Sequence, residues 1–375
     1  MPSCCAGCGE SLAGAAETGI ERRQVTEIPP VRAEVTEHQL IELWSARRLR
    51  DADEGGGAAR GDGPGAVRAA IGVYLWHGQF LSRDRACRAL ADLFGCVPSP
   101  VALASMARKA AGVIAPALKA IISALVRAEV THFDETGFRV AGKLAWVHSA
   151  SSGRHVLVTV HAKRGKEGMN AVGVLPSFAG IACHDAWAPY DCYDGVAGHA
   201  LCGAHLLREL AAVTETGTAS DVTWAEQTID ALLALKEAAD AARAAGQAAI
   251  DPQTVEKQGR WFRDAADASV ALSAVRRGKL QKKRNAVATR MRDRADDYLR
   301  YADDLRVPFD NNEAERVIRM SKLRIKVSGC MRSMTGAENF CAIRSYLATA
   351  SRHGIGWLDA LTRAAEGNPW IPDTT

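Results

Sequence analysis

The chain has 375 residues, of which 47% are hydrophobic, so it is long enough to bury a substantial core in two or three domains. Its formal net charge of +4 comes from 47 Lys and Arg against 43 Asp and Glu, a balance that by itself indicates no particular partner. No apolar stretch is long enough to span a bilayer, and no charged-then-apolar leader begins the chain, which excludes a membrane protein. We therefore expect a soluble, cytoplasmic protein.

The cysteines favour buried reduced thiols over a disulfide framework, because most of the ten are single and scattered through apolar stretches. The exception is the N-terminal CCAGCGESL, where Cys5 and Cys8 form a C-x-x-C pair, which is half of a zinc site. Four ligands are needed, no second C-x-x-C follows, and only His38 is a nearby candidate. The sequence thus indicates a zinc site at Cys5 and Cys8 but does not supply all four of its ligands.

The first part of the chain predicts a linker followed by helices. Residues 26–40 alternate weakly and suggest a short strand pair, whereas DADEGGGAARGDGPG at 51–65 cannot support a packed core. Beyond it, a helix capped by Ser82 or Asp84 should end at Gly95, and a second should start at Ser99. This pair resembles a helix-turn-helix in size, and a simple αα-hairpin fits equally well.

A strand-rich unit follows. Residues 130–136, 143–151 and 155–162 predict a three-stranded antiparallel meander, and 180–185 predict a short apolar strand that ends in Asp185. Because side chains alternate along a strand, Asp134 and Glu135 must face opposite sides, so only one of them can belong to a given site.

A long helical stretch then interrupts this unit, with helices predicted at 202–213, 223–249 and within 255–305. We interpret most of it as an insertion into the strand-rich domain. Its 276–294 segment carries nine Lys and Arg against one acid. Such a run is either a solvated helix face or a contact for a polyanion.

The sequence FDNNEAERVIR predicts a helix that carries Glu315. Asp310 is placed as its N-cap, with Glu313 completing a capping box. On this interpretation Glu315 projects from a stripe shared with Asn311 and Arg319, and the alternative for Glu315 is a simple ion pair with Arg319.

Three acids stand out along the chain: Asp134 in HFDETGFRV, Asp185 in CHDAWAPYD and Glu315. Converging carboxylates repel one another, so they make physical sense chiefly as ligands of hard divalent cations. This pattern indicates metal-assisted phosphoryl transfer. A glycoside hydrolase would also use paired carboxylates, but it would usually line its groove with aromatic residues, which make up only 6% of this chain.

Four ordered blocks make the chain similar to bacterial transposases of the insertion sequence 66 family: HFDETGFRV, HDAWAPYDCY, CGAHLLREL and FDNNEAERVIRMSKLRIKVSG. The resemblance implies an α/β protein with a ribonuclease H-like mixed sheet core, a helical insertion and a preceding helix-turn-helix-like region. It also implies an Asp, Asp, Glu triad that binds two magnesium ions, and these roles fall on Asp134, Asp185 and Glu315. The family pattern includes Cys202, His205 and Arg208 as well.

The implied activity is strand cleavage and strand transfer on double-stranded DNA at the ends of an insertion sequence and at its target. Asn311 and Asn312 would support the site. Basic side chains would hold the DNA backbone, namely Arg319, Lys322, Arg324, Lys326, Lys282, Lys283 and Arg284. A homodimer on DNA is expected by analogy, and accessory proteins of the element are possible partners.

The implied domain order is a remnant of a zinc module at 1–40, a linker at 41–65, a helix-turn-helix-like region at 66–125 and a catalytic core divided between 126–215 and 301–348. The helical insertion occupies 216–300, and a helical tail occupies 349–375. The N-terminal part departs from the family pattern, because IELWSARRLRDADEGGGAARGDG stands where a second cysteine pair is expected. A catalytically impaired DNA-binding copy is therefore the alternative function.

Overall fold

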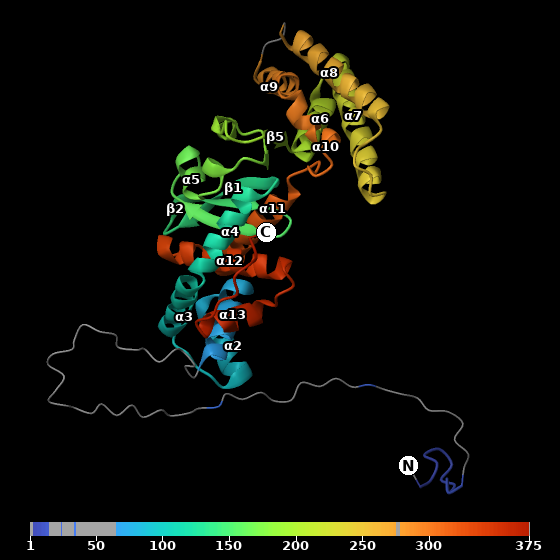
Figure 1. Cartoon of the computed structure of the whole chain (residues 1–375). Helices are drawn as coiled ribbons and strands as arrows, with labels where there is room; N and C mark the ends of the chain where they lie inside the picture. Colours follow the sequence, from blue (N-terminus) through green and yellow to red (C-terminus); the bar gives the residue numbers. More distant parts are fainter. Residues whose placement is uncertain (1–2, 15–23, 25–33, 35–64, 275–277, 375) are drawn as a thin grey trace, which may run out of the picture.

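A computed structural model describes residues 3–14, 24, 34, 65–274 and 278–374 (Figure 1). The expected strand pair at 26–40, His38 and the linker at 41–65 lie almost wholly outside these residues, so the structure does not bear on them.

The centre of the molecule is a five-stranded mixed sheet in the order β3-β2-β1-β4-β5. The first three strands form the expected antiparallel meander, while β4 runs parallel to β1, and β5 runs parallel to β4. The strands are β1 (Val130–Val140), β2 (Lys143–Ser151), β3 (Val156–His161), β4 (Ile181–His184) and β5 (Gly198–Leu201). The sequence analysis missed β5, because the four residues GHAL carry too little alternation to distinguish a strand.

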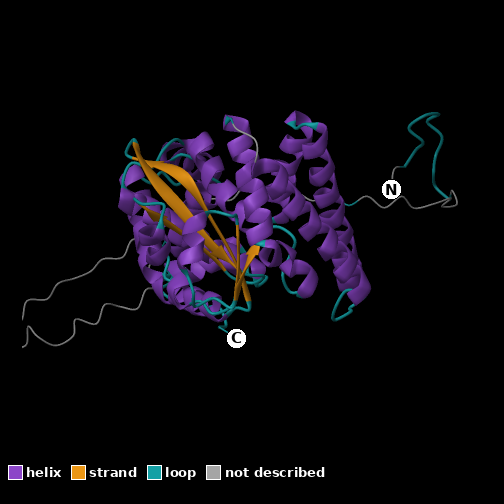
Figure 2. Ribbon diagram, turned by 90° about the horizontal axis from the view of Figure 1, so that it is seen from above, coloured by secondary structure: helices purple, strands orange, loops and turns teal. Residues whose placement is uncertain are grey.

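Helices cover both faces of the sheet (Figure 2). On one face, Phe133 of β1 packs in a cluster with Ile121 and Leu125 of α4 (Ala115–Arg127) and with Met169 of α5 (Lys166–Ala171). On the other face, Phe138 of β1 packs in a cluster that includes residues of α11 (Asn312–Ser328) and α12 (Met334–Arg352). The even-numbered side chains of β1, Asp134 among them, therefore project toward the side that carries α11.

The expected helical insertion lies between β5 and α11. It forms one apolar core with β4 and β5, in which Leu206, Leu232, Phe262 and Tyr298 are buried. Figure 1 shows it as a separate group of helices beyond the β5 edge of the sheet. The group consists of α6 (Gly203–Thr216), which falls almost wholly in the expected first part of the core, and of the helices of the expected insertion at 216–300, namely α7 (Ala219–Ala244), α8 (Pro252–Ala274), α9 (Lys279–Asp293) and α10 (Ala295–Asp303).

The helices before the sheet pack against the C-terminal part of the chain. The expected helix pair is present, with Ser82 and Ser99 as side-chain N-caps and Gly95 in the left-handed region at φ 68°. Residues from the helices before the sheet and from the C-terminal helices share one core, which includes Ala70, Ala107, Tyr346 and Leu361. The elements are α1 (Ala66–Val73), the π-helical turn η1 (Tyr74–Gly78), α2 (Arg83–Phe94), α3 (Pro100–Val113) and α13 (Trp357–Ala365). The segment at 349–375 is therefore part of this core.

Two short 3-10 turns complete the sheet region, η2 (Leu175–Ser177) and η3 (Ala188–Cys192). In the described part of the chain, no single helix has both the length and the apolarity to cross a membrane. Taken together, α3 and α4 reach that length and apolarity, but they meet at a bend of 48°.

One glycine at the start of α6 tests the packing that holds this helix near the sheet. A Cβ atom at Gly203 would lie 2.4 Å from the buried Phe309 ring. We expect Gly203→Ala to lower the free energy of unfolding by about 1–3 kcal/mol, because the ring and helix must move apart. The change is measured as a shift in thermal or urea unfolding followed by circular dichroism.

Gly112→Ala in α3 is the matched control, since no atom lies within 4 Å of the added Cβ. Alanine in a helix should leave stability unchanged or raise it by up to about 1 kcal/mol. Equal stability of the Gly203 and Gly112 variants would contradict the close packing of α6 on Phe309.

Candidate active site

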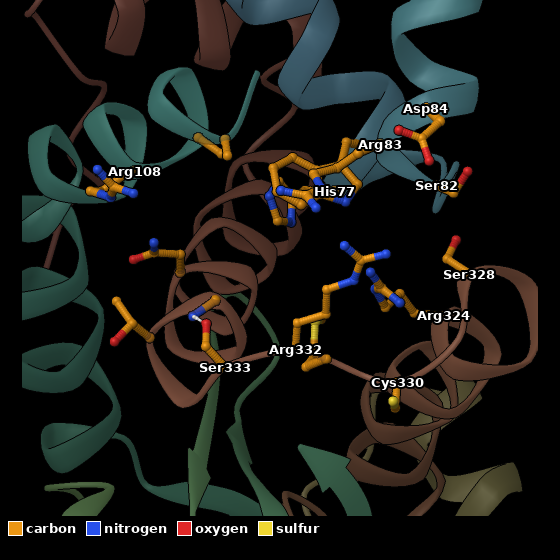
Figure 3. Close-up of a pocket in the computed structure, with 17 residues that line it drawn as sticks. His77, Ser82, Arg83, Asp84, Arg108, Arg324, Ser328, Cys330, Arg332 and Ser333 are labelled. Carbon is orange, nitrogen blue, oxygen red and sulfur yellow. Dashed lines mark hydrogen bonds between the residues drawn. The ribbon is translucent and has the colours of Figure 1, made fainter. Parts of the chain in front are cut away.

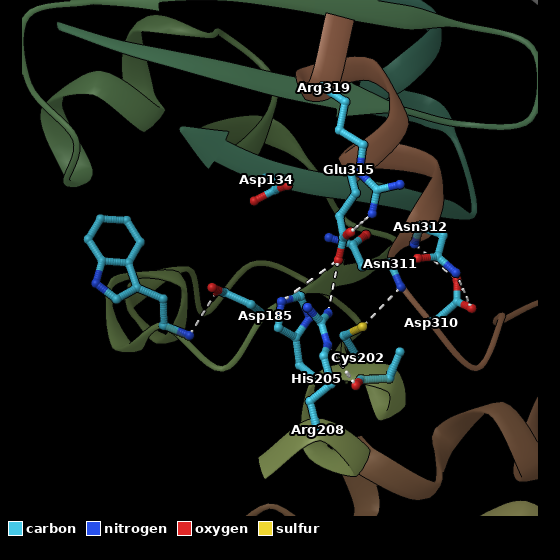
Figure 4. Close-up of polar contacts among 12 residues, drawn as sticks. Asp134, Asp185, Cys202, His205, Arg208, Asp310, Asn311, Asn312, Glu315 and Arg319 are labelled. Carbon is cyan, nitrogen blue, oxygen red and sulfur yellow. Dashed lines mark hydrogen bonds and ion pairs between the residues drawn. The ribbon is translucent and has the colours of Figure 1, made fainter. Parts of the chain in front are cut away.

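The sheet register brings the first two acids together. β1 and β4 are neighbouring parallel strands in which His132 pairs with Cys183. Asp134 and Asp185 each follow two residues later, so both lie at the same end of the shared ladder. Glu315 is in the first turn of α11, which packs on β1. Figure 4 shows the three carboxylates around one space.

The acids share an electrostatic field. Burial, together with the negative charges of Glu135, Asp185 and Glu315, raises the pKa of Asp134 to about 7. One hydrogen bond opposes this shift, since the backbone N–H of Glu135 donates to Asp134 Oδ1 at 2.8 Å. Asp185 Oδ1 likewise accepts from the backbone N–H of Trp187 at 3.0 Å. No cation contacts Asp134 or Asp185 among the described side chains.

Glu135 faces the other side of β1, as alternation requires. Its carboxylate accepts from Arg164 at 2.7 and 3.0 Å and from the Tyr190 hydroxyl at 2.6 Å. The Arg164 guanidinium also lies 3.8 Å from the centre of the Trp187 ring. Glu135 is therefore committed to a buried polar cluster, and Asp134 is the acid that is free to bind a ligand.

Glu315 is surrounded by positively charged or basic side chains. Its Oε2 lies 2.7 Å from Arg319, so the expected i, i+4 ion pair is present. Its Oε1 lies 3.4 Å from Arg208 and 3.7 Å from His205 Nε2, both on α6. These α6 contacts were not anticipated, although the Cys-x-x-His-x-x-Arg spacing places all three side chains near one face of a helix and was the available signal.

Asn311 is buried at the junction of β1 and α11. Its Nδ2 donates to the backbone oxygen of Phe133 at 2.8 Å, and His132 Nδ1 donates to its Oδ1 at 2.8 Å. Its backbone N–H also donates to Cys202 Sγ at 3.2 Å. Asn311 therefore points into the interior and does not share an exposed stripe with Glu315.

The capping arrangement expected for α11 is wrong. Asn311 is the N-cap residue and makes no side-chain cap, while the Asp310 carboxylate accepts from Asn312, at 3.0 Å from its backbone N and 2.6 Å from Nδ2. Glu313 pairs with Arg352 at 2.7 Å. The long-range contacts of Asn311 and Glu313 override the local capping pattern.

Cys202, His205 and Glu315 form a second group of potential ligands. One ligand atom from each lies within 4.8 Å of the others, which is close enough for a single metal ion to bind all three. Cys202 is buried, which agrees with the packing role expected for it, whereas the His205 side chain is 41% exposed. A thiolate, imidazole and carboxylate set suits zinc, so such an ion would compete for Glu315.

The basic side chains on α11 divide into two groups. Arg319, Lys322 and Lys326 are exposed and follow Glu315 along one stripe of the helix at i+4, i+7 and i+11. Arg324 is only 5% exposed, and its Nη1 donates to the backbone oxygen of Gly329 at 2.6 Å. The structure therefore does not bring Arg324 onto the stripe.

A cleft of about 800 Å³ runs from Asp185 to the helical insertion, and neither Asp134 nor Glu315 lines it. It begins at Asp185, passes His205 and Arg208, and is bounded on the far side by Lys283 and Arg290 of α9. On α9, Lys282 and Lys283 are exposed, whereas Arg284 is paired with Asp221 and with the backbone of Thr216. Lys283 therefore offers an unpaired ammonium to the same cleft as Asp185.

Cys5 and Cys8 lie in the described N-terminal segment 3–14 and carry free thiols. Backbone N–H groups of Gly7 and Cys8 lower the pKa of Cys5, which favours the thiolate that a metal requires. Within the described residues no group of three ligands includes either cysteine.

The raised pKa of Asp134 predicts how the stability of the protein changes with pH. Between pH of about 3.9 and about 7 an unfolded Asp has released its proton while Asp134 in the folded chain retains it, so stability falls as pH rises across this window and stays low above it. We expect Asp134→Asn to raise the Tm of the metal-free protein at pH 8 by about 2–4 °C and to raise it less at pH 5.5, where Asp134 is protonated.

Asp194→Asn, which removes an exposed carboxylate outside the cluster, is the control and should leave the Tm within about 1 °C at both pH values. A pH-independent effect of Asp134→Asn would contradict the raised pKa of Asp134.

The residues of the candidate site fall within the sequence pattern of a known protein family. The sequence profile described as "Transposase IS66 family" matches residues 64–339, which include the three acids, Asn311 and the whole helical insertion. No curated protein matches the chain. Because the profile covers well over half of the sequence, the resemblance of the four sequence blocks is confirmed. The chain belongs to the IS66 family of transposases.

Proposed function

We propose that the chain is a DNA transposase that cuts strands at the ends of an insertion sequence and joins them to a target, with Asp134, Asp185 and Glu315 as its catalytic residues. The observation that carries the proposal is the convergence of these acids from β1, from the end of β4 and from α11. Burial raises the pKa of Asp134 most, and the charges of Glu135, Asp185 and Glu315 add to that rise. Such mutual repulsion is costly unless a cation offsets it.

The donor set supports divalent metal binding. Asp134 and Asp185 hold only one backbone hydrogen bond each, so most of their acceptor positions remain open to a cation. Carboxylate oxygens are the ligands that magnesium prefers, and we propose Asp134, Asp185 and Glu315 as its ligands. When bound, two magnesium ions would neutralise charge on the scissile phosphate and activate the attacking oxygen.

The remaining residues act by positioning. Asn311 joins α11 to the backbone of β1 beside Asp134, which keeps Glu315 close to the two aspartates. His205, Arg208 and Arg319 hold the Glu315 carboxylate before substrate arrives. Since Arg208 and Arg319 are more than 60% exposed, they can exchange Glu315 for phosphate oxygens when DNA enters.

The reaction consists of two displacements at phosphorus. Water first attacks a phosphodiester, one of its protons passes to solvent, and the P–O bond to the 3′ oxygen breaks to release a 3′ hydroxyl. That hydroxyl then loses its proton to solvent and attacks a phosphodiester of the target, whose own 3′ oxygen leaves as the new P–O bond forms and takes up a proton. We propose that duplex DNA follows the basic stripe of α11 and enters the cleft bounded by Lys283.

The architecture agrees with the proposal. A mixed sheet with one acid on β1 and a second just after the end of the adjacent parallel strand β4 supports a ribonuclease H-like core, which we propose is divided by the helical insertion into the segments 126–215 and 301–348. The helix pair α2–α3 supports a DNA-binding region at 66–125. A homodimer and accessory proteins of the element remain proposals by analogy.

Substitution of the acids tests the catalytic assignment. Asp134→Asn, Asp185→Asn and Glu315→Gln should each reduce magnesium-dependent nicking of DNA by at least about 10³-fold, because each removes a charged metal ligand. DNA binding should be retained. Nicking of a labelled duplex that carries the element end, with binding measured in parallel, provides the test.

Glu313→Gln is the matched control, since Glu313 lies on the same helix and pairs with Arg352. It should retain nicking. Full activity of Glu315→Gln with loss in Glu313→Gln would transfer the role to Glu313. DNA binding without magnesium-dependent nicking in the unsubstituted chain would favour the alternative, a catalytically impaired copy.

Charge reversal tests the proposed path of DNA. Lys282→Glu with Lys283→Glu should weaken DNA binding and lower the slope of log affinity against log salt by about 2, because two phosphate contacts are lost. The paired change Lys119→Glu with Lys143→Glu alters exposed lysines of α4 and β2 that do not line the cleft. A similar loss in both double variants would indicate a general charge effect.

A further inference from the structure

A second polar pocket lies away from the acids, where α2 and α3 meet the end of α11 and the start of α12 (Figure 3). Its volume is about 280 Å³. Four arginines from four different positions line it, together with one acid, Asp84. The arginines are Arg83 of α2, Arg108 of α3, Arg324 of α11 and Arg332 before α12. The lining therefore carries a formal charge of +3.

These four arginines form no ion pair with any described residue, although one acid, Asp84, also lines the pocket. In the part of the chain that the structure describes, no carboxylate forms an ion pair with Arg83, Arg108, Arg324 or Arg332. Arg83 lies over the Trp76 ring at 5.9 Å, and Arg324 is buried with a single hydrogen bond to Gly329. Like charges gathered around one space repel one another, so the arrangement is stabilised by an anion.

His77 provides an independent indication of a ligand. The residue is 2% exposed and lines the pocket, yet neither ring nitrogen has a hydrogen-bond partner. Burial and the charges of Arg324 and Arg344 lower the pKa of His77 to about 3, so its ring is neutral and carries one N–H donor. A buried polar group without a partner costs free energy, and an anion oxygen in the pocket would satisfy it.

Two helices add their positive ends. Ser82 caps α2 and Ser333 caps α12, and both serines line the pocket. The helices have 12 and 19 residues, and first-turn residues of both, Arg83 of α2 and Thr335 and Gly336 of α12, line the pocket. The positive ends of both helix dipoles therefore lie at the pocket. Phosphate is the anion that matches several guanidinium forks together with helix N-termini.

We propose that this pocket binds a phosphate group, held by Arg83, Arg108, Arg324 and Arg332, with His77 as a neutral donor. The phosphate belongs either to the DNA backbone or to a small phosphate-bearing molecule, and only the DNA source rests on the proposed function. The pocket is distinct from the site of Asp134, Asp185 and Glu315, because the two share no lining residue.

Calorimetric titration of the full chain with inorganic phosphate, in a phosphate-free buffer of low ionic strength, tests the proposal. The unsubstituted chain should bind phosphate saturably. Arg332→Gln and Arg83→Gln should each weaken binding at least tenfold, because a charge-assisted hydrogen bond is lost. His77→Phe, which keeps an aromatic ring against Trp76 and Phe340, should weaken it at least threefold.

Arg88→Gln is the control, since Arg88 is exposed on α2 and does not line the pocket. It should bind phosphate as the unsubstituted chain does. Arg332 is also exposed, so its substitution tests the pocket even where His77→Phe fails to fold. Absence of saturable phosphate binding, or equal losses in Arg88→Gln and Arg332→Gln, would overturn the proposal.

Duplex DNA separates the two sources. Competition between phosphate and DNA, with DNA binding weakened in Arg332→Gln, supports a backbone phosphate. Unchanged DNA binding in Arg332→Gln, alongside lost phosphate binding, supports a small molecule. Magnesium-dependent nicking, measured in the same variants, distinguishes failure of this pocket from failure of the catalytic assignment.

Discussion

The candidate active site depends on one buried amide. Asn311 donates to the main chain of β1 beside Asp134, accepts from His132, and through its backbone N–H contacts Cys202 at the start of α6. These three bonds join the strand that carries the first acid, the helix that carries the third acid, and the helix that carries His205. Since each bond is buried, a shift of α11 would leave several polar groups without partners, which costs about 1–3 kcal/mol for each group.

The opposing force is the repulsion among the acids. Asp134 is largely buried beside Asp185 and Glu315 and has no cation of its own, while Glu315 is balanced by Arg208 and Arg319. Buried charge of one sign is typical of functional sites, because the surrounding packing must offset its cost. The contacts of Asn311, together with the apolar faces of α11 and α12, provide that packing.

Positive charge is gathered in three other places, which differ in burial. The stripe of Arg319, Lys322 and Lys326 and the cleft side of α9 are exposed, as expected of side chains that hold a flexible polyanion. The pocket lined by Arg83, Arg108, Arg324 and Arg332 is partly buried and includes the unpaired His77, as expected of a site for a single phosphate. The exposed and the partly buried environments thus distinguish basic residues that the sequence alone does not separate.

The amino-acid sequence by itself determined the local elements: the β1–β3 meander from its alternation, both ends of α2 from Ser82 and Gly95, and the start of α3 from Ser99. It also proposed Asp134, Asp185 and Glu315 as the candidate acids from their sequence blocks. Only the tertiary structure decided which side chains meet or become buried away from their neighbours in the sequence. Examples are the inward-pointing Asn311, the ion pair of Glu313 with Arg352, the burial of Arg324 and the approach of His205 to Glu315. The short strand β5 also became recognisable only beside β4. The physical reason is that alternation and capping act between neighbours in the chain, whereas these contacts join residues up to 179 positions apart, where packing determines which side chains meet.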